Sequence, residues 1–122
     1  MVYGTLKSGY HNNYLLGGAR LVGKAVTLKA YQLFDCGFPM AVPSDEKAFP
    51  VLGEIYEVSD DAFRRCDSLE GHPDWYIRRI IEAKLVDNEE IVQTYIYEMP
   101  RISNHRTQLC DVKDNTYYMW SR

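Results

Sequence analysis

The chain has 122 residues, of which 46% are hydrophobic and 25% charged, and its formal net charge is -3. These values predict one globular domain over residues 1–122 and argue against a disordered chain. The acidic balance and the lack of a clustered basic surface argue against nucleic-acid binding. No apolar run is long enough to cross a bilayer, so no membrane span is expected.

The cysteines and histidines do not follow a disulfide or metal-binding pattern. The cysteines are odd in number and form no CxxC pair, and the histidines lack ligand spacing; the residues are Cys36, Cys66, Cys110, His11, His72 and His105. We therefore expect no metal and no cofactor. The N-terminus has neither the basic nor the apolar region of a secretion signal, so we expect a cytoplasmic protein with reduced thiols.

Strand signals dominate the first third of the chain. Residues 1–6 predict a first strand, which a Gly-Thr pair interrupts. Residues 12–16 predict one short helical turn before a Gly-Gly pair. Residues 20–34 are rich in β-forming residues and predict one long or bent strand, with a bulge at Gly23.

The middle of the chain predicts an extended piece over 38–43, a proline-bounded loop over 44–50 and a strand over 51–58. Strict alternation in that strand assigns one face to Leu52, Glu54, Tyr56 and Val58. Glu54 would then be a buried carboxylate. We expect it to be structural and paired with an arginine such as Arg78 or Arg79, because a mid-strand position offers no opening to a substrate.

A single main helix is predicted over about 59–70. Ser59 is a favourable N-cap, and Gly71 stands where a C-terminal cap belongs. Pro73 prevents the helix from continuing.

The last third of the chain predicts a hairpin of strands over 75–87 and 91–99. Residues 101–116 are polar and predict a loop, whereas the aromatic tail TYYMW is expected to dock on the body. The whole pattern predicts a small, β-dominated α+β domain with a strongly bent sheet, closed into a barrel, and one main helix.

Glu70 is a charged residue at a position of the predicted helix where a buried, apolar residue would be expected. The apolar stripe of the helix consists of Ala62, Phe63, Cys66 and Leu69. Glu70 follows Cys66 by four residues, on the buried side and near the negative end of the helix dipole. Both effects disfavour the charged form, so we predict a raised pKa, which suits proton exchange near neutral pH. The alternative is an end-of-helix residue whose stem covers the core while its carboxylate stays in water.

Two segments carry a resemblance to a known family. The stretch VYGTLKSGYHNNYLL and the later stretch CDSLEGHPDWYIRR occur in the order and at the distance seen in the γ-glutamylcyclotransferase-like superfamily. Phe38-Pro39 and Gly53-Glu54-Ile55-Tyr56 fall between them as expected. The sequence is most similar to the branch of γ-glutamylamine cyclotransferases and AIG2-like proteins, and the resemblance covers residues 2–98.

The resemblance implies a small mixed β-barrel with an internal pocket. Glu70 would be the catalytic acid/base of that pocket, and Tyr76 would line or support it. The substrate-binding residues that it implies belong to the YGTL turn and are Tyr3, Gly4, Thr5 and Leu6. Backbone N–H groups of such a turn can hold a carboxylate or a developing oxyanion, and Gly4 lets the backbone approach closely.

The activity that the resemblance implies is intramolecular aminolysis of a small γ-glutamyl substrate. The free α-amine attacks the γ-carbonyl, 5-oxoproline closes and the attached amine leaves, with no metal or cofactor. Loops over 44–50 and 101–116 would select the leaving group. The protein would be a monomer or a weak dimer.

Three alternatives stay open. The chain could be a non-catalytic binding or stress-response member of the same fold. It could instead be a cysteine hydrolase that uses Cys66 and His72, although a cysteine on an apolar stripe is more typical of a core. It could also apply the same chemistry to another leaving group, which the sequence does not identify.

Overall fold

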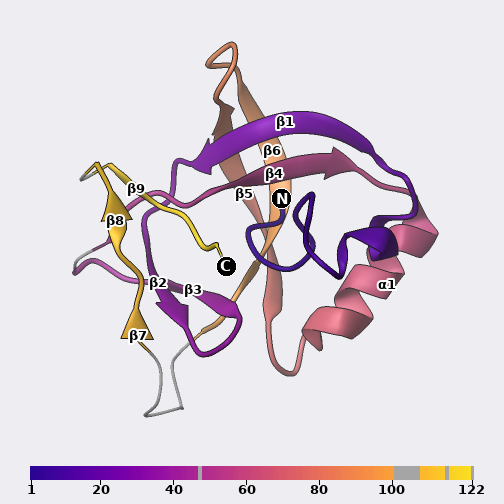
Figure 1. Cartoon of the computed structure of the whole chain (residues 1–122), viewed down its shortest axis with the longest axis horizontal. Helices are drawn as coiled ribbons and strands as arrows, with labels where there is room; N and C mark the ends of the chain where they lie inside the picture. Colours follow the sequence, from indigo (N-terminus) through magenta and orange to yellow (C-terminus); the bar gives the residue numbers. More distant parts are fainter. Residues whose placement is uncertain (47, 101–107, 115, 122) are drawn as a thin grey trace.

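The structure is a computed structural model that describes residues 1–46, 48–100, 108–114 and 116–121. A four-stranded antiparallel sheet with strand order β4-β1-β5-β6 curls into half a barrel, and helix α1 packs at one end of it (Figure 1). Its strands are β1 (Arg20–Thr27), β4 (Leu52–Glu57), β5 (Ile77–Leu85) and β6 (Ile91–Glu98). The predicted α+β class with a bent sheet and one main helix is confirmed.

The hairpin β5–β6 follows the sequence prediction most closely. Its strands pair continuously from Ile77 opposite Glu98 to Lys84 opposite Ile91. The inward-facing side chains of β5 alternate along the strand and include Ile81, Ala83 and Leu85. The bulge predicted in β1 is also present, as a register shift between Leu21 and Gly23.

Two smaller sheets complete the fold. One has strand order β3-β2-β7 and the other is the pair β8-β9; their strands are β2 (Tyr31–Asp35), β3 (Pro39–Pro43), β7 (Gln108–Leu109), β8 (Val112–Lys113) and β9 (Tyr117–Tyr118). The single strand predicted over 20–34 is therefore wrong. The chain turns at 28–30, where the Thr27 hydroxyl donates a hydrogen bond of 2.6 Å to the Lys29 carbonyl.

The loop predicted over 101–116 is also wrong in part, because β7 and β8 lie within it. Residues 101–107 and 115 of that prediction lie outside the described residues. The aromatic tail docks as expected, with Tyr118 and Trp120 fully buried. The Lys7 ammonium donates a hydrogen bond of 2.5 Å to the Trp120 carbonyl, which ties the tail to the first loop.

The first strand predicted over 1–6 does not form. Val2 alone pairs, in an isolated bridge with Glu54 whose two N–H···O bonds are each 2.8 Å long. The chain then turns, and the Lys7 N–H donates to the Gly4 carbonyl at 3.0 Å. The predicted helical turn is confirmed as the 3₁₀-helix η1 (Asn13–Leu16).

Helix α1 (Asp60–Glu70) begins and ends where its capping residues predict. The Ser59 hydroxyl accepts a hydrogen bond from the Ala62 N–H at 3.1 Å. Gly71 adopts the left-handed conformation with φ 66° and closes the last turn. Because this cap ends the helix at Glu70, the carboxylate stands at the open end of the helix. No helix within the described residues is long and apolar enough to span a membrane.

Candidate active site

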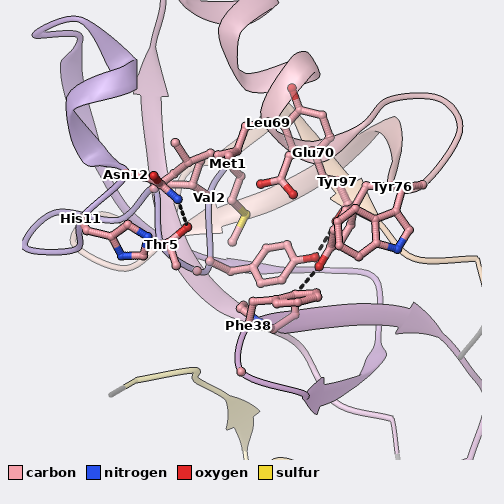
Figure 2. A pocket seen from close by; sticks show the side chains of 16 residues that line it. Met1, Val2, Thr5, His11, Asn12, Phe38, Leu69, Glu70, Tyr76 and Tyr97 are labelled. Atoms are coloured by element: carbon pink, nitrogen blue, oxygen red, sulfur yellow. Dashed lines mark hydrogen bonds between the residues drawn. The ribbon is translucent and has the colours of Figure 1, made fainter. Parts of the chain in front are cut away.

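A cavity of about 310 Å³ opens where the end of α1, the turn after Val2 and the β2–β3 connection meet (Figure 2). Sixteen residues line it: Met1, Val2, Tyr3, Gly4, Thr5, Leu6, His11, Asn12, Gly37, Phe38, Pro39, Leu69, Glu70, Trp75, Tyr76 and Tyr97. All six residues that the sequence singled out as site residues are among them. The fold therefore brings together segments that lie about 70 positions apart in the chain.

Glu70 is the acidic group of this cavity. Figure 2 shows its carboxylate pointing into the open space, with Thr5 and Asn12 on one side and Tyr76 on the other. Burial raises the pKa of Glu70 from 4.5 to about 7. No described residue forms an ion pair or a hydrogen bond with this carboxylate that would offset the lost solvation. The predicted rise in pKa is confirmed, and burial is its cause.

The raised pKa of Glu70 predicts a pH dependence of stability. Between pH 4.5 and about 7 the folded chain keeps a proton that the unfolded chain releases. The folded state thus binds more protons in this window, and the free energy of unfolding falls as pH rises through it, by ~2–3 kcal/mol. Denaturant unfolding of the wild type and Glu70→Gln at both ends of the window measures this. An equal pH dependence in both proteins would contradict the prediction.

The YGTL turn forms the wall that faces Glu70. The Asn12 amide donates a hydrogen bond of 2.8 Å to the Thr5 hydroxyl oxygen, which fixes this hydroxyl at the cavity wall (Figure 2). The backbone N–H groups of Gly4, Thr5 and Leu6 donate to no described residue. A Cβ atom on Gly4 would lie 2.7 Å from Cγ of Pro39, so the turn packs directly on the first residue of β3. The wall thus offers a hydroxyl and unpaired backbone donors.

Tyr3 fixes this wall from behind. Its buried hydroxyl donates to the Tyr97 carbonyl at 2.6 Å and accepts from the Ala41 N–H at 3.2 Å. It therefore joins the turn to both β6 and β3.

Replacing Tyr3 with phenylalanine leaves two buried backbone groups unpaired. We expect Tyr3→Phe to lower the free energy of unfolding by about 1–3 kcal/mol, measured by urea denaturation. Tyr14→Phe, at an exposed tyrosine outside the cavity, serves as the comparison variant. An unchanged midpoint in Tyr3→Phe would contradict this account of the hydroxyl.

A polar cluster holds the end of α1 against the sheet. The Asp67 carboxylate accepts hydrogen bonds of 2.5 Å from both the Arg78 guanidinium and the Tyr97 hydroxyl. The same guanidinium lies 4.4 Å from the ring centre of Phe63. Because Asp67 is three residues before Glu70 on the helix, the cluster fixes the position of the catalytic candidate.

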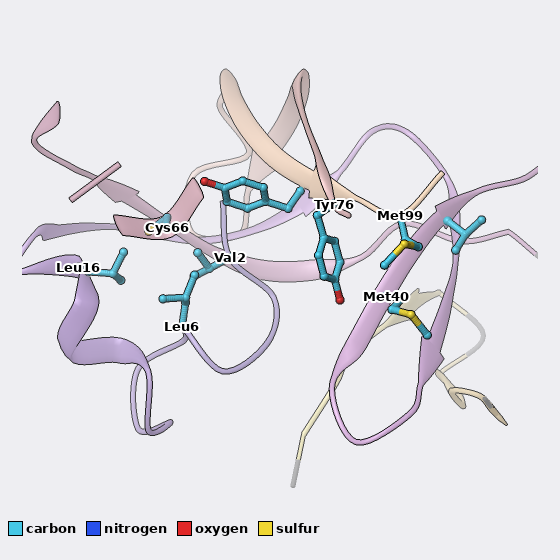
Figure 3. Close-up of a cluster of buried hydrophobic side chains, with 9 residues drawn as sticks. Val2, Leu6, Leu16, Met40, Cys66, Tyr76 and Met99 are labelled. Carbon is cyan, nitrogen blue, oxygen red and sulfur yellow. The ribbon is translucent and has the colours of Figure 1, made fainter. Parts of the chain in front are cut away.

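The floor of the cavity is part of a hydrophobic cluster (Figure 3). Val2, Leu6, Tyr76 and Cys66 are buried together there. The Tyr76 hydroxyl donates to the Pro39 carbonyl at 2.7 Å, so its side chain is held against β3.

The cysteine-hydrolase alternative does not fit these contacts. Cys66 is only 4% exposed, and burial raises the pKa of its thiol, which opposes formation of the nucleophilic thiolate. His72 is engaged elsewhere, since its Nδ1 accepts a hydrogen bond from the Arg78 N–H at 3.0 Å. Cys66 is a core residue.

Glu54 is not paired with Arg78 or Arg79, so that prediction is wrong. Its carboxylate is half-buried and accepts hydrogen bonds from the Ser8 N–H at 2.7 Å and the Tyr56 hydroxyl at 3.0 Å. The predicted face is the less buried one, because the alternate residues of β4, Gly53 and Ile55, point into the core. The structural role predicted for Glu54 agrees with these contacts to the first loop.

Several residues of the cavity were not among the site residues predicted from the sequence. They are Asn12, Phe38, Leu69, Trp75 and Tyr97, together with His11. His11 and Asn12 lie within the stretch VYGTLKSGYHNNYLL. Their closeness in sequence to the YGTL turn could have identified them as residues of the site. The described residues of the 44–50 loop do not line the cavity, which argues against their predicted role in specificity. No grouping of acidic, histidine or cysteine side chains in the described ranges could hold a metal ion.

Solved structures confirm the type of fold. The crystal structure of an AIG2-like protein from Mus musculus superposes with a TM-score of 0.77 at 27% identity, covering 86% of this chain and 78% of that one. An uncharacterised protein from Pyrococcus horikoshii superposes with a TM-score of 0.65 at 25% identity, covering 88% and 81%.

Sequence comparisons identify the family. A gamma-glutamylcyclotransferase of Methanocaldococcus jannaschii, provisionally so named, is 32% identical over 93% of both chains. Gamma-glutamylaminecyclotransferase of Bos taurus is 33% identical over 79% of this chain, and the match spans 62% of the bovine protein. A family model described as gamma-glutamyl cyclotransferase, AIG2-like, matches residues 1–120. The chain therefore belongs to the gamma-glutamyl cyclotransferase, AIG2-like family.

Proposed function

We propose that this protein converts a γ-glutamyl amine or γ-glutamyl amino acid into 5-oxoproline and a free amine, with Glu70 as general acid and base. The observation that carries the proposal is the position of the Glu70 carboxylate. It points into a cavity opposite a wall of hydrogen-bond donors, and its pKa is about 7. Family membership supplies the reaction class, since several relatives are named for it.

Binding would orient the γ-glutamyl group between the YGTL turn and Glu70. The Thr5 hydroxyl and the backbone N–H groups of residues 4–6 are the donors for its carboxylate and its γ-carbonyl oxygen. The tethered α-amine and the γ-carbonyl already belong to one molecule. The main task of the protein is therefore to fold the glutamyl arm into the geometry of a five-membered ring.

The reaction requires a group that first takes up a proton and later donates one. Ionised Glu70 takes a proton from the α-ammonium group, and the neutral amine attacks the γ-carbonyl. The C–N bond of the ring forms, and negative charge develops on the carbonyl oxygen, where the backbone donors stabilise it. Protonated Glu70 then gives its proton to the departing nitrogen as the original amide bond breaks. The ring nitrogen releases its second hydrogen as a proton to solvent, so the products are 5-oxoproline and the free amine, and Glu70 is again ionised. A pKa near 7 allows both transfers at neutral pH.

A non-catalytic binding protein of the same fold remains the second candidate. It would keep the cavity, but it would have no need for a carboxylate with a raised pKa and no pairing partner among the described residues.

The test that separates the two candidates is release of 5-oxoproline from γ-glutamyl-ε-lysine, γ-glutamyl-alanine, glutathione and a γ-glutamyl arylamide. We expect release from at least one compound. Binding without release from any of them would favour the second candidate.

A further inference from the structure

The outer part of the cavity carries an aromatic pair that the proposed reaction does not use. Trp75 is 49% exposed although it lines the cavity. Its ring packs edge-on against Phe38, with ring centres 5.3 Å apart, and in a tilted arrangement against Tyr76, with ring centres 5.4 Å apart. We name Phe38 and Trp75 the aromatic rim.

Local structure holds the aromatic rim in place. The left-handed cap at Gly71 reverses the chain after α1, and the Trp75 N–H donates to the Gly71 carbonyl at 2.8 Å. A Cβ atom on Gly71 would lie 3.1 Å from Cβ of Trp75, so the two residues are in direct contact. Trp75 is thus a half-exposed indole with a fixed backbone, which is a typical arrangement for ligand stacking.

The rim lies on the side of Glu70 where the leaving group must be. Figure 2 shows Thr5, His11 and Asn12 on one side of the Glu70 carboxylate and Tyr76 on the other, and the Trp75 ring packs against the Tyr76 ring with centres 5.4 Å apart. A γ-glutamyl group held at the YGTL turn would place its scissile bond at Glu70. The amine beyond that bond would then lie against the rim.

The charge of the lining restricts what this amine can carry. None of the described residues that line the cavity is lysine or arginine, and Glu70 is the only carboxylate among them. At the rim, a leaving amine with its own carboxylate would meet apolar rings and a neighbouring acid, because His11 lies on the opposite side of Glu70 and the terminal amine of Met1 donates to the Tyr95 carbonyl. Burying such a group without compensation is unfavourable.

We propose that Trp75 selects the leaving group, and that this group is an aromatic or extended apolar amine without a carboxylate next to the scissile nitrogen. The inference rests on the proposed function, because it assumes that the γ-glutamyl group occupies the turn. It assigns specificity to the segment that follows the catalytic helix.

Four γ-glutamyl compounds test the inference in matched pairs. The phenethylamide and the phenylalanine adduct differ only by a carboxylate, as do the ethylamide and the alanine adduct. For the wild type we expect kcat/KM for the phenethylamide to exceed that for the ethylamide by about 10-fold or more. The same excess is expected over the phenylalanine adduct.

Substitutions at the rim locate the cause of that preference. Trp75→Ala is expected to lower kcat/KM for the phenethylamide by about 10-fold, and that for the ethylamide by less than about threefold. Trp75→Phe should retain most of the preference, and Ile80→Ala, which changes an exposed residue of β5, should change none of the four values. Equal losses on all compounds in Trp75→Ala, or a preference for the carboxylate-bearing members, would overturn the inference.

A binding measurement separates this inference from the proposed reaction. Calorimetric titration of Glu70→Gln with the same compounds reports affinity without turnover. If no compound releases 5-oxoproline but the phenethylamide binds most tightly and loses that advantage in Glu70→Gln/Trp75→Ala, the reaction is wrong and the selectivity of the rim stands. If the four affinities are equal, the inference is wrong whatever the activity.

Discussion

Glu70→Gln is expected to reduce kcat/KM for 5-oxoproline release by at least about 100-fold. Glutamine has nearly the same shape as glutamate, but it can neither accept the proton of the α-ammonium nor return one to the leaving nitrogen. The Glu70 carboxylate has no ion-pair or hydrogen-bond partner among the described residues, so its replacement breaks no contact that holds the fold. The loss should therefore appear in turnover with an unchanged circular dichroism spectrum.

The matched control for this loss is Glu82→Gln, which removes an exposed carboxylate from β5. It should leave kcat/KM unchanged. The pH profile of the wild type supplies a second check, because activity that depends on ionised Glu70 should rise with pH through about 7 and not through 4.5. Near-normal turnover in Glu70→Gln would refute the assignment of Glu70 as the acid/base.

Gly53→Ala is expected to cost about 3 kcal/mol of unfolding free energy. A Cβ atom at position 53 would lie 2.4 Å from the Val2 carbonyl oxygen, which is too close for any side chain. Relieving this contact requires residue 2 to move away from β4, which breaks the bridge between Val2 and Glu54. Because that bridge leads directly into the YGTL turn, the wall of the cavity moves with it.

The displaced wall should also lower kcat/KM, by about 10-fold or more, since small displacements of a binding group cost large factors in rate. Gly18→Ala is the control that separates the effect of lower stability from the effect of a displaced cavity wall. Gly18 has φ 74° and no atom within 4 Å of its missing Cβ, so this variant should lose about 1–2 kcal/mol from backbone strain while turnover is preserved. Equal activity losses in the two variants would contradict the positional argument.

The sequence predicted helix α1 and the β5–β6 hairpin well, because residues within or next to these elements determine where they begin and end. Ser59 and Gly71 cap α1 because a hydroxyl and a left-handed glycine satisfy the helix ends without help from the rest of the chain. The alternation in β5 and its short turn into β6 fixed the hairpin in the same way. Glu70 could be placed on the buried side because helical spacing follows from the same signals.

The remaining differences arise from contacts between distant segments. Residues 1–6 have strand composition, yet only Val2 finds a strand partner, because the chain must turn to form the cavity wall. The break between β1 and β2 sends them into two different sheets, and no local residue signals that change. Tyr97 and Trp75 enter the site through pairing and turn geometry, which the sequence pattern does not contain.

The most direct test of the central claim is the product formed in water enriched with heavy oxygen. Cyclisation by the substrate's own amine predicts equal amounts of 5-oxoproline and free amine, no glutamate and no heavy oxygen in the product. Glutamate that carries heavy oxygen would show that water is the nucleophile. That result would contradict an intramolecular role for the cavity and make the protein a hydrolase.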